Sequence, residues 1–211
     1  MKSRKFIKKL PLVIGLIFLL FSAIMLVWRL LPSERVEQKL TIPAGLLPAS
    51  PEGLDLRLHQ DIGLCLRWPK QVKAGDTAEV WLQINPGKVL ESFPASEDCQ
   101  IVLSAELAMI GLGQSPQGEI QTAFDESHVT TLTWQLQGDI EGEYQGTLWV
   151  NLDFMDKNGE MIEVSIAALD IQTEVKSLWG LNSVSATWLG MLGLLLWGVM
   201  MIWGVKMEHS A

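Results

Sequence analysis

The sequence predicts an all-β domain, an immunoglobulin-like antiparallel sandwich, flanked by two transmembrane helices. Two observations predict this class: long uncharged stretches lie near both ends of the 211-residue chain, and the residues between them alternate between apolar and polar side chains. Charge is the third observation, because residues 33–184 hold 23 of the 24 acidic residues but 9 of the 16 basic ones, a net charge of −14. An acidic exterior domain is therefore expected between two membrane anchors.

The first element is a transmembrane helix expected over residues 10–31, after a basic N-terminus at 1–9. Residues 10–28 carry no charge, and about 19 residues at ~1.5 Å each nearly match a hydrocarbon core of ~30 Å. A cleaved signal peptide is the alternative, since the N-terminus resembles a basic n-region. The apolar stretch is longer than a usual h-region and no small-x-small site follows it, so a retained anchor is expected.

The second transmembrane helix is expected over residues 186–205, with a juxtamembrane segment at 177–185 and a short tail at 206–211. Small residues recur along roughly one face of this helix, at Ala186, Gly190, Gly193 and Gly204. Such spacing allows close helix contact, so we predict packing against the first helix or another subunit. The alternative is that glycine is merely tolerated there, while Trp179, Trp188 and Trp203 anchor the helix at the membrane interfaces.

Flanking charges predict the orientation. Five basic residues precede the first helix, whereas Arg29 and Arg35 are the basic residues that follow it closely. The rule that basic loops stay in the cytoplasm then places both termini inside and the main domain in the periplasm or outside the cell. The sequence also contains no N-x-Ser/Thr sequon.

Between the first helix and the domain, residues 32–52 contain four prolines, at Pro32, Pro43, Pro48 and Pro51. Proline lacks a backbone donor and disfavours helix and sheet, so this linker is expected to be an extended spacer or an arm lying on the domain.

The domain itself is expected over residues 53–176, because short apolar-polar alternations recur there between turn-forming residues. The expected strands centre on residues 54–58, 64–68, 80–84, 101–107, 132–136, 148–154 and 161–175. In the last of these the apolar phase shifts after Ile166, which a bulge near Ala167 and Ala168 would explain. Seven or eight strands without an amphipathic helix predict a sandwich.

Two segments carry a resemblance to known proteins. Trp68-Pro69, Val72 and Ala74-Gly75-Asp76, followed by Val80, Leu82 and Ile84, resemble the opening of many bacterial Ig-like modules. The later Trp134-Gln135-Leu136, with Gly142, Gly146 and residues 148–152, resembles their closing hairpin. The chain thus resembles membrane-anchored bacterial proteins with an Ig-like β-sandwich ectodomain. This resemblance and the lack of a sequon lead us to expect a bacterial plasma (inner) membrane. This likeness covers about half of the domain; it implies architecture and brings no catalytic residues with it.

Both cysteines, Cys65 and Cys99, lie in the exterior domain, where a disulfide could form. It would close a loop of roughly 35 residues and stabilise the fold by ~3 to 4 kcal/mol. Strand alternation places Cys65 opposite Leu64 and Leu66, whereas Cys99 lies with Ile101. Two buried free thiols are therefore the alternative to the bond.

The sequence offers few residues for chemistry. His128 follows Asp125 and Glu126 in an expected loop and is a weak metal candidate, although adjacent polar loop residues are more often solvated. Copper ligation by His128 with Met155 and Met161 is a further option, but methionines beside strands usually fill core gaps. No nucleophile motif accompanies a histidine, so we expect neither an enzyme nor a cofactor.

The predicted function is that of a non-enzymatic accessory or interaction protein whose exterior sandwich contacts other membrane-protein subunits or surface proteins. The lipid bilayer is the other expected partner, whereas an acidic domain disfavours nucleic acid. No ionisable residue lies in the middle of either span, so a transport path is not expected. The alternative function is an exterior ligand- or metal-binding domain for copper or another cation.

Overall fold

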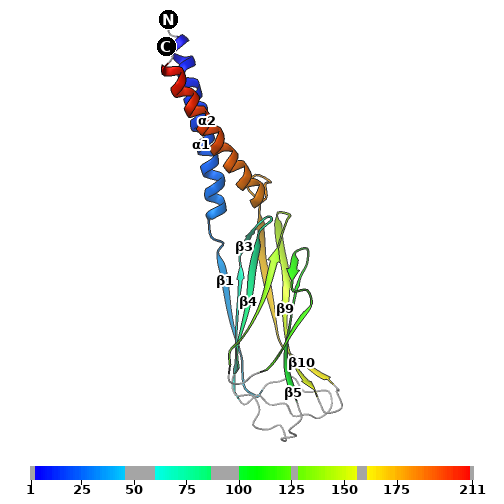
Figure 1. The fold of residues 1–211 in the computed structure, drawn as a ribbon. Coiled ribbons are helices and arrows are strands. Elements are labelled where there is room, and N and C mark those ends of the chain that lie inside the picture. The colour runs from blue at the N-terminus through cyan, green and yellow to red at the C-terminus, as the bar shows by residue number, and fades with distance from the viewer. Residues whose placement is uncertain (1–2, 46–59, 87–99, 125–127, 156–160, 210–211) are drawn as a thin grey trace. The chain divides into compact units, whose positions relative to one another are not determined.

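A computed structural model describes residues 3–45, 60–86, 100–124, 128–155 and 161–209 (Figure 1). The chain divides into two compact units. The helical unit contains Met1–Pro32, Lys73–Asp76 and Lys176–Ala211, and the sandwich unit contains Ser33–Val72 and Thr77–Val175. The short segment Lys73–Asp76 thus belongs with the helices, although it connects two strands in sequence.

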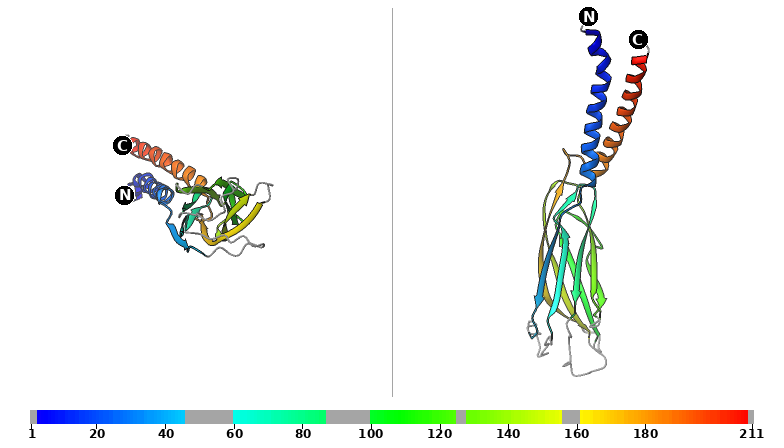
Figure 2. Two further views of the ribbon diagram at one scale, coloured as in Figure 1. Left: turned by 90° about the horizontal axis from the view of Figure 1, so that it is seen from below. Right: turned by 90° about the vertical axis from the view of Figure 1, so that its left-hand side faces the viewer.

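The helical unit is an antiparallel pair formed by α1 (Ser3–Leu30) and α2 (Ser183–His209). The two helices lie side by side, and the two chain termini lie at the same end of the pair (Figures 1 and 2). Within them, Leu12–Leu30 and Ser183–Lys206 are long and apolar enough to cross a membrane. The two predicted spans are therefore helices of sufficient length, and a hydrocarbon core of ~30 Å would accommodate both.

Local chemistry marks where α2 begins. Asn182 precedes the helix, and its Oδ1 accepts a hydrogen bond from the backbone N–H of Ser185 at 2.8 Å. This is the N-cap interaction that satisfies one of the amide groups left unpaired in a first helical turn. The helix therefore begins three residues before the apolar stretch at 186–205 over which it was expected.

The sandwich unit contains two five-stranded sheets, and every strand pairing described is antiparallel. The first sheet has the order β1 (Arg35–Ile42), β2 (Ile62–Pro69), β4 (Thr77–Asn85), β8 (Thr130–Gln137) and β6 (Gly113–Ser115). The second has the order β3 (Gln71–Lys73), β10 (Met161–Lys176), β9 (Gly142–Met155), β5 (Gln100–Met109) and β7 (Glu119–Ala123). The predicted all-β antiparallel domain is confirmed.

Alternate residues of the long strands form the core, as the period of two predicts. Buried side chains come from both sheets: Leu64, Leu66, Val80, Leu82, Ile84, Trp134 and Leu136 from the first, and Leu103, Leu107, Leu148, Val150, Leu152, Leu169 and Ile171 from the second. Removal of this apolar surface from water is the main term that stabilises such a sandwich. The side chains that alternate with these core residues point outward and form the two outer faces.

One expectation about the linker is wrong. Residues 35–42 form β1, which pairs with β2 along its whole length, from Arg35 opposite Pro69 to Ile42 opposite Ile62. Pro32 and Pro43 flank this strand without interrupting it, so every strand residue keeps its backbone donor. This part of the linker therefore agrees with the alternative of an arm that lies on the domain, and it forms an edge strand of the first sheet. The strand expected at residues 54–58 lies outside the described residues.

The last strand contains the irregularity that its apolar pattern indicates. The pairing of β10 with β9 shifts register between Ser165 and Ala167, so one extra residue is accommodated in β10. Val164 before the shift and Leu169 after it are both buried, at 5% and 3% exposure. A bulge lets residues of opposite sequence parity face the same core. The bulge therefore occurs one residue before the predicted position.

Candidate interaction surfaces

Small side chains form the seam of the helix pair. Ala186, Gly190, Gly193 and Gly204 of α2 are all buried. A Cβ added to Gly190 would lie 3.1 Å from Cγ of Leu26 and 3.3 Å from Cβ of Met25, and one added to Gly193 would collide with Oγ of Ser22. The glycines thus allow close approach of α1 backbone and side chains, as in other small-residue helix seams.

The outward surface of the same pair is apolar. Large exposed side chains line both helices: Leu16, Ile17, Leu20, Ile24 and Val27 on α1, and Met191, Leu192, Leu195, Val199 and Ile202 on α2. Contiguous apolar surface of this extent is unfavourable in water and is typical of a membrane-facing surface. The helix pair therefore has a closed inner seam and an outer surface suited to lipid.

A polar cluster joins three segments of the helical unit, and we call it the helix-end cluster: Arg29, Asp76 and Ser183. The Arg29 guanidinium donates to Oδ1 of Asp76 at 2.5 Å and also to the hydroxyl of Ser183, which itself donates to Asp76. Arg29 lies at the end of α1 and Ser183 at the start of α2. Charge-assisted hydrogen bonds of this kind are stronger than neutral ones and hold groups in a defined geometry.

Lys73 adds a cap to the end of α1. Its Nζ donates to the backbone carbonyls of Arg29 at 2.7 Å and Leu31 at 2.6 Å, and it lies 5.7 Å from the centroid of the Trp28 ring. A cation is favourable at a helix C-terminus, where carbonyl groups lack partners. Burial lowers the pKa of the Lys73 ammonium, and the nearby Arg29 lowers it further, while Asp76 acts in the opposite direction.

Tryptophans gather at this end of the helical unit. Trp179 stacks on Phe21 with ring centroids 6.0 Å apart and planes 16° from parallel, yet 66% of Trp179 is exposed. Trp188 is 70% exposed. Amphipathic aromatic rings favour the boundary between lipid and water, so these residues suit an interfacial position.

In the sandwich unit, the outward side chains of β5, β7, β9 and β10 form a surface that we call the acidic face. Strand register places acids directly opposite acids: Glu106 opposite Glu119, and Asp153 opposite Glu163. Among the described residues of these four strands, the basic one is Lys176, which ends β10 and belongs to the helical unit. The acidic face within the sandwich unit thus has no basic residue of its own strands.

Trp149 lies in the middle of the acidic face. It is 45% exposed and lies opposite Glu106 on β5 and Ala168 on β10. The first sheet also carries an outward tryptophan, Trp81 of β4, but there the Arg35 guanidinium lies 4.8 Å from the ring centroid. Such a cation over the ring is an attractive contact. Trp149 has no comparable cation among the described residues.

Three polar side chains of the acidic face are buried. Ser104, Asn151 and Asp153 have exposures of 0%, 7% and 2%. The amide of Asn151 donates to Oε1 of Glu163 at 2.6 Å, whereas Oδ2 of Asp153 and Oγ of Ser104 have no hydrogen-bond partner in the part of the chain that the structure describes. Burial raises the pKa of the Asp153 carboxyl, the nearby Ser104 hydroxyl lowers it, and the charge of Glu119 raises it. A buried, unpartnered oxygen is costly in a folded protein.

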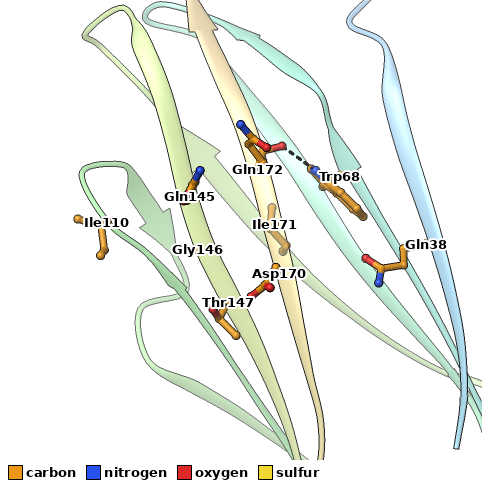
Figure 3. Close-up of a pocket in the computed structure, with 9 residues that line it drawn as sticks. All are labelled: Gln38, Trp68, Ile110, Gln145, Gly146, Thr147, Asp170, Ile171 and Gln172. Atoms are coloured by element: carbon orange, nitrogen blue, oxygen red, sulfur yellow. Dashed lines mark hydrogen bonds between the residues drawn. The ribbon is translucent and has the colours of Figure 1, made fainter.

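A hollow of about 590 Å³ lies in the sandwich unit (Figure 3). Its lining includes three glutamines, Trp68 and a single carboxylate, Asp170, whose Oδ1 accepts a hydrogen bond from Thr147 at 3.3 Å. The Trp68 indole N–H donates to the backbone carbonyl of Gln172 at 2.9 Å. None of the described lining residues is a histidine, cysteine or lysine. The hollow offers hydrogen bonds but no pairing of a base with a nucleophile.

The described structure contains only part of the metal and disulfide residues expected from sequence, so both sites stay predictions. His128 is exposed, and its expected companions Asp125 and Glu126 lie outside the described residues. Within the described ranges no three His, Cys, Asp or Glu side chains form a metal-binding group. Cys65 is half-buried on β2, between the buried Leu64 and Leu66, and Cys99 lies outside the described residues. The disulfide stays a prediction.

No protein-family model and no curated protein sequence matches this chain. Among solved structures, a chain from the complex of Zinc 2-glycoprotein and Prolactin inducible protein from human seminal plasma is 13% identical, with 56% of this chain and 93% of that one covered and a TM-score of 0.34. The CARDB domain of the PF1109 protein from Pyrococcus furiosus is 12% identical, with coverage of 54% and 89% and a TM-score of 0.32.

AggA, the major subunit of aggregative adherence fimbriae type I from Escherichia coli, is 9% identical, with coverage of 70% and 98% and a TM-score of 0.29. Likenesses this weak carry no functional argument. The description of the sandwich therefore rests on the strand pairing and the core of this chain.

Proposed function

We propose that this protein is a non-enzymatic, membrane-anchored interaction protein whose sandwich domain contacts other membrane-protein subunits or surface proteins. In this proposal α1 and α2 cross a bacterial inner membrane as a pair, both termini lie in the cytoplasm and the sandwich lies outside. The basic residues before α1 and Lys206 near the end of α2 support this orientation.

The observation that carries the proposal is the acidic face. It is an outer sheet face with a 45% exposed Trp149 and with carboxylates that lack counter-charges on their own strands. Tryptophan is enriched among the residues that contribute most of the binding free energy at protein interfaces. An exposed tryptophan on a regular sheet, with no catalytic pairing in the described hollow, supports a contact surface rather than an active site.

The experiment is affinity purification of the tagged full chain from its native membrane in a mild non-ionic detergent, followed by mass spectrometry. We expect one or more membrane or surface proteins to co-elute in fixed proportion with the tagged chain. A two-pass membrane protein with the same tag and an unrelated exterior domain serves as the control. If the chain elutes alone, or with the same proteins as the control, the interaction role is wrong.

The alternative of an exterior ligand- or copper-binding domain stays a prediction, because Asp125 and Glu126 lie outside the described residues. Calorimetric titration of the full chain with copper, zinc and calcium tests it. Heat that saturates at a fixed metal-to-protein ratio, and that His128→Ala abolishes, would favour this alternative over the interaction role.

A further inference from the structure

Opposed carboxylates make the acidic face unfavourable for the isolated chain. Glu106 and Glu119 lie directly across the β5–β7 pairing, and Asp153 and Glu163 lie directly across the β9–β10 pairing. Like charges in directly opposed positions destabilise a sheet. Neighbouring amides donate to two of these acids, since Gln121 binds Glu119 at 2.9 Å and Asn151 binds Glu163 at 2.6 Å. An amide offsets desolvation but does not neutralise the charge.

Trp149 supplies a second feature at the same place. Glu106 lies opposite it on one side, and on the other side Ala168 has a side chain too short to cover an indole ring. Asp170 of β10 lies diagonal to Trp149, because it is opposite Thr147, two residues before Trp149 on β9. A cation above Trp149 would therefore contact the ring and lie between carboxylates. The Arg35–Trp81 contact at 4.8 Å is the same arrangement made within the first sheet.

The buried Asp153 is the third and independent observation. Among the described residues its Oδ2 and the Oγ of Ser104 have no hydrogen-bond partner, although both residues are at least 98% buried. Burial without a counter-charge raises the pKa of the Asp153 carboxyl. A positive charge docked on the exposed Glu163, directly opposite Asp153, would stabilise the ionised form of Asp153 through space.

These features extend over four strands, and within the described residues they do not converge on one metal-binding group. We infer that the acidic face docks a basic protein segment, which places an arginine or lysine side chain on Trp149 and further cations against the Glu106–Glu119 pair and the exposed Glu163. This inference rests on the proposed interaction role and names the chemistry of the partner. Arginine fits best, because its planar guanidinium both stacks on an indole and donates to carboxylates.

The test is a titration of fluorescein-labelled nona-arginine with the full chain in non-ionic detergent, followed by fluorescence anisotropy. We expect saturable binding that weakens with added salt. Trp149→Ala should weaken it about 5-fold, within the range of a single cation–π contact. The double variant Glu106→Gln/Glu119→Gln should weaken it about 10-fold through the loss of two charges.

Matched controls separate the acidic face from the overall negative charge. Glu79→Gln/Asp139→Asn also removes two exposed carboxylates, one from β4 and one from the loop after β8, and should change affinity by less than about 2-fold. Trp149→Phe keeps an aromatic ring and should retain part of the affinity, which guards against a folding defect in Trp149→Ala. Near-equal weakening by the two double variants, or no effect of either Trp149 variant, would overturn the inference.

Competition with calcium tests whether the acidic face binds a metal ion instead of a basic protein segment. If 1 mM-scale CaCl₂ displaces the peptide far more than NaCl of equal ionic strength, the face is a metal site and the basic-partner inference is wrong. The inference and the proposed function fail in different ways. A partner that co-purifies equally well with wild type and with Glu106→Gln/Glu119→Gln would leave the interaction role intact and exclude this face. A chain that purifies alone but binds nona-arginine selectively would exclude the interaction role in its native membrane and leave the basic-segment inference for this face intact.

Discussion

The two sheets of the sandwich differ in the partners that the charged side chains on their outer faces contact. In the first sheet, Glu37 accepts a hydrogen bond from Arg67 at 2.8 Å and forms an ion pair with Lys39 at 3.0 Å. Arg35 lies over Trp81. In the second sheet, acids face acids across the strands, and Trp149 is 45% exposed. The first face pairs its charged groups with opposite charges, whereas the second pairs two of its carboxylates with the neutral amides of Gln121 and Asn151.

This difference arises within one domain whose two sheets share a core. Core packing therefore does not require it, because outward side chains can change without altering the inner face of a strand. The second face carries an electrostatic cost that the first avoids. The inferred basic partner would offset this cost, and the following predictions test the contrast.

The largest expected effect separates the two outward tryptophans. Trp81→Ala removes a half-buried ring together with its contact to Arg35 and should reduce the free energy of unfolding by about 2 kcal/mol. Trp149→Ala removes a more exposed ring without such a contact and should cost about 1 kcal/mol or less. Urea unfolding of the sandwich in the full chain, followed by far-ultraviolet circular dichroism, measures both. Equal losses would remove the contrast.

Asp153→Asn should stabilise the protein at neutral pH by about 1 kcal/mol, the scale of one unpartnered buried polar group. In the wild-type protein the pKa of the Asp153 carboxyl in the folded state lies above the ordinary value of 3.8, because the group is buried. The folded state thus binds the proton more tightly, and stability falls as pH rises from about that ordinary value through the raised one. The variant should lack this fall. Unfolding at a series of pH values measures it, and an unchanged pH profile would contradict the prediction.

Charge reversal at one position of the second sheet should stabilise the sandwich. Glu106→Lys places a cation opposite Glu119 and should add about 0.5 kcal/mol to the free energy of unfolding while weakening nona-arginine binding. Glu79→Lys is the control, because Glu79 lies opposite the neutral Gln135 in the first sheet. That change should leave both quantities nearly constant. A loss of stability in Glu106→Lys would show that the opposed acids do not strain the sheet.

The smallest effect is expected at the exposed ion pairs of the first sheet. Hydrogen bonds from Lys39 and Arg67 lower the pKa of Glu37 below its ordinary value of 4.5. This contribution to stability is present above 4.5 and is lost as pH falls through the lowered value. Glu37→Gln should lower the melting temperature slightly in low salt and not at all in high salt, since salt screens exposed pairs. A salt-independent loss would indicate packing instead.

Several elements of the fold follow from local sequence patterns. The uncharged stretches that become α1 and α2, the alternation of Leu64, Leu66 and Trp68, and the phase shift in β10 each depend on residues close in the chain. Period and composition are read directly at that range. The prolines of the linker were misleading, because their number suggested a spacer while their positions left residues 35–42 uninterrupted for β1.

The candidate surface could not be found in the same way. Glu106 and Glu119 belong to different strands, and sequence alternation alone does not tell whether they lie opposite each other or on separate sheets. The contrast between Trp81 and Trp149 likewise depends on where Arg35 lies in space. The composition carried a signal, since β5, β7 and β9 contain no Lys or Arg. That signal predicts an acidic surface only once these strands are known to lie in one sheet.

By itself the sequence determined two apolar helices, an acidic domain between them and strands with one buried face each, because hydrophobic burial and charge depend on residue type and local period. Tertiary structure alone decided which helix faces meet, which strands share a sheet and which acids oppose one another. Those pairings bring together residues far apart in the chain, and the free energy of register depends on both partners at once.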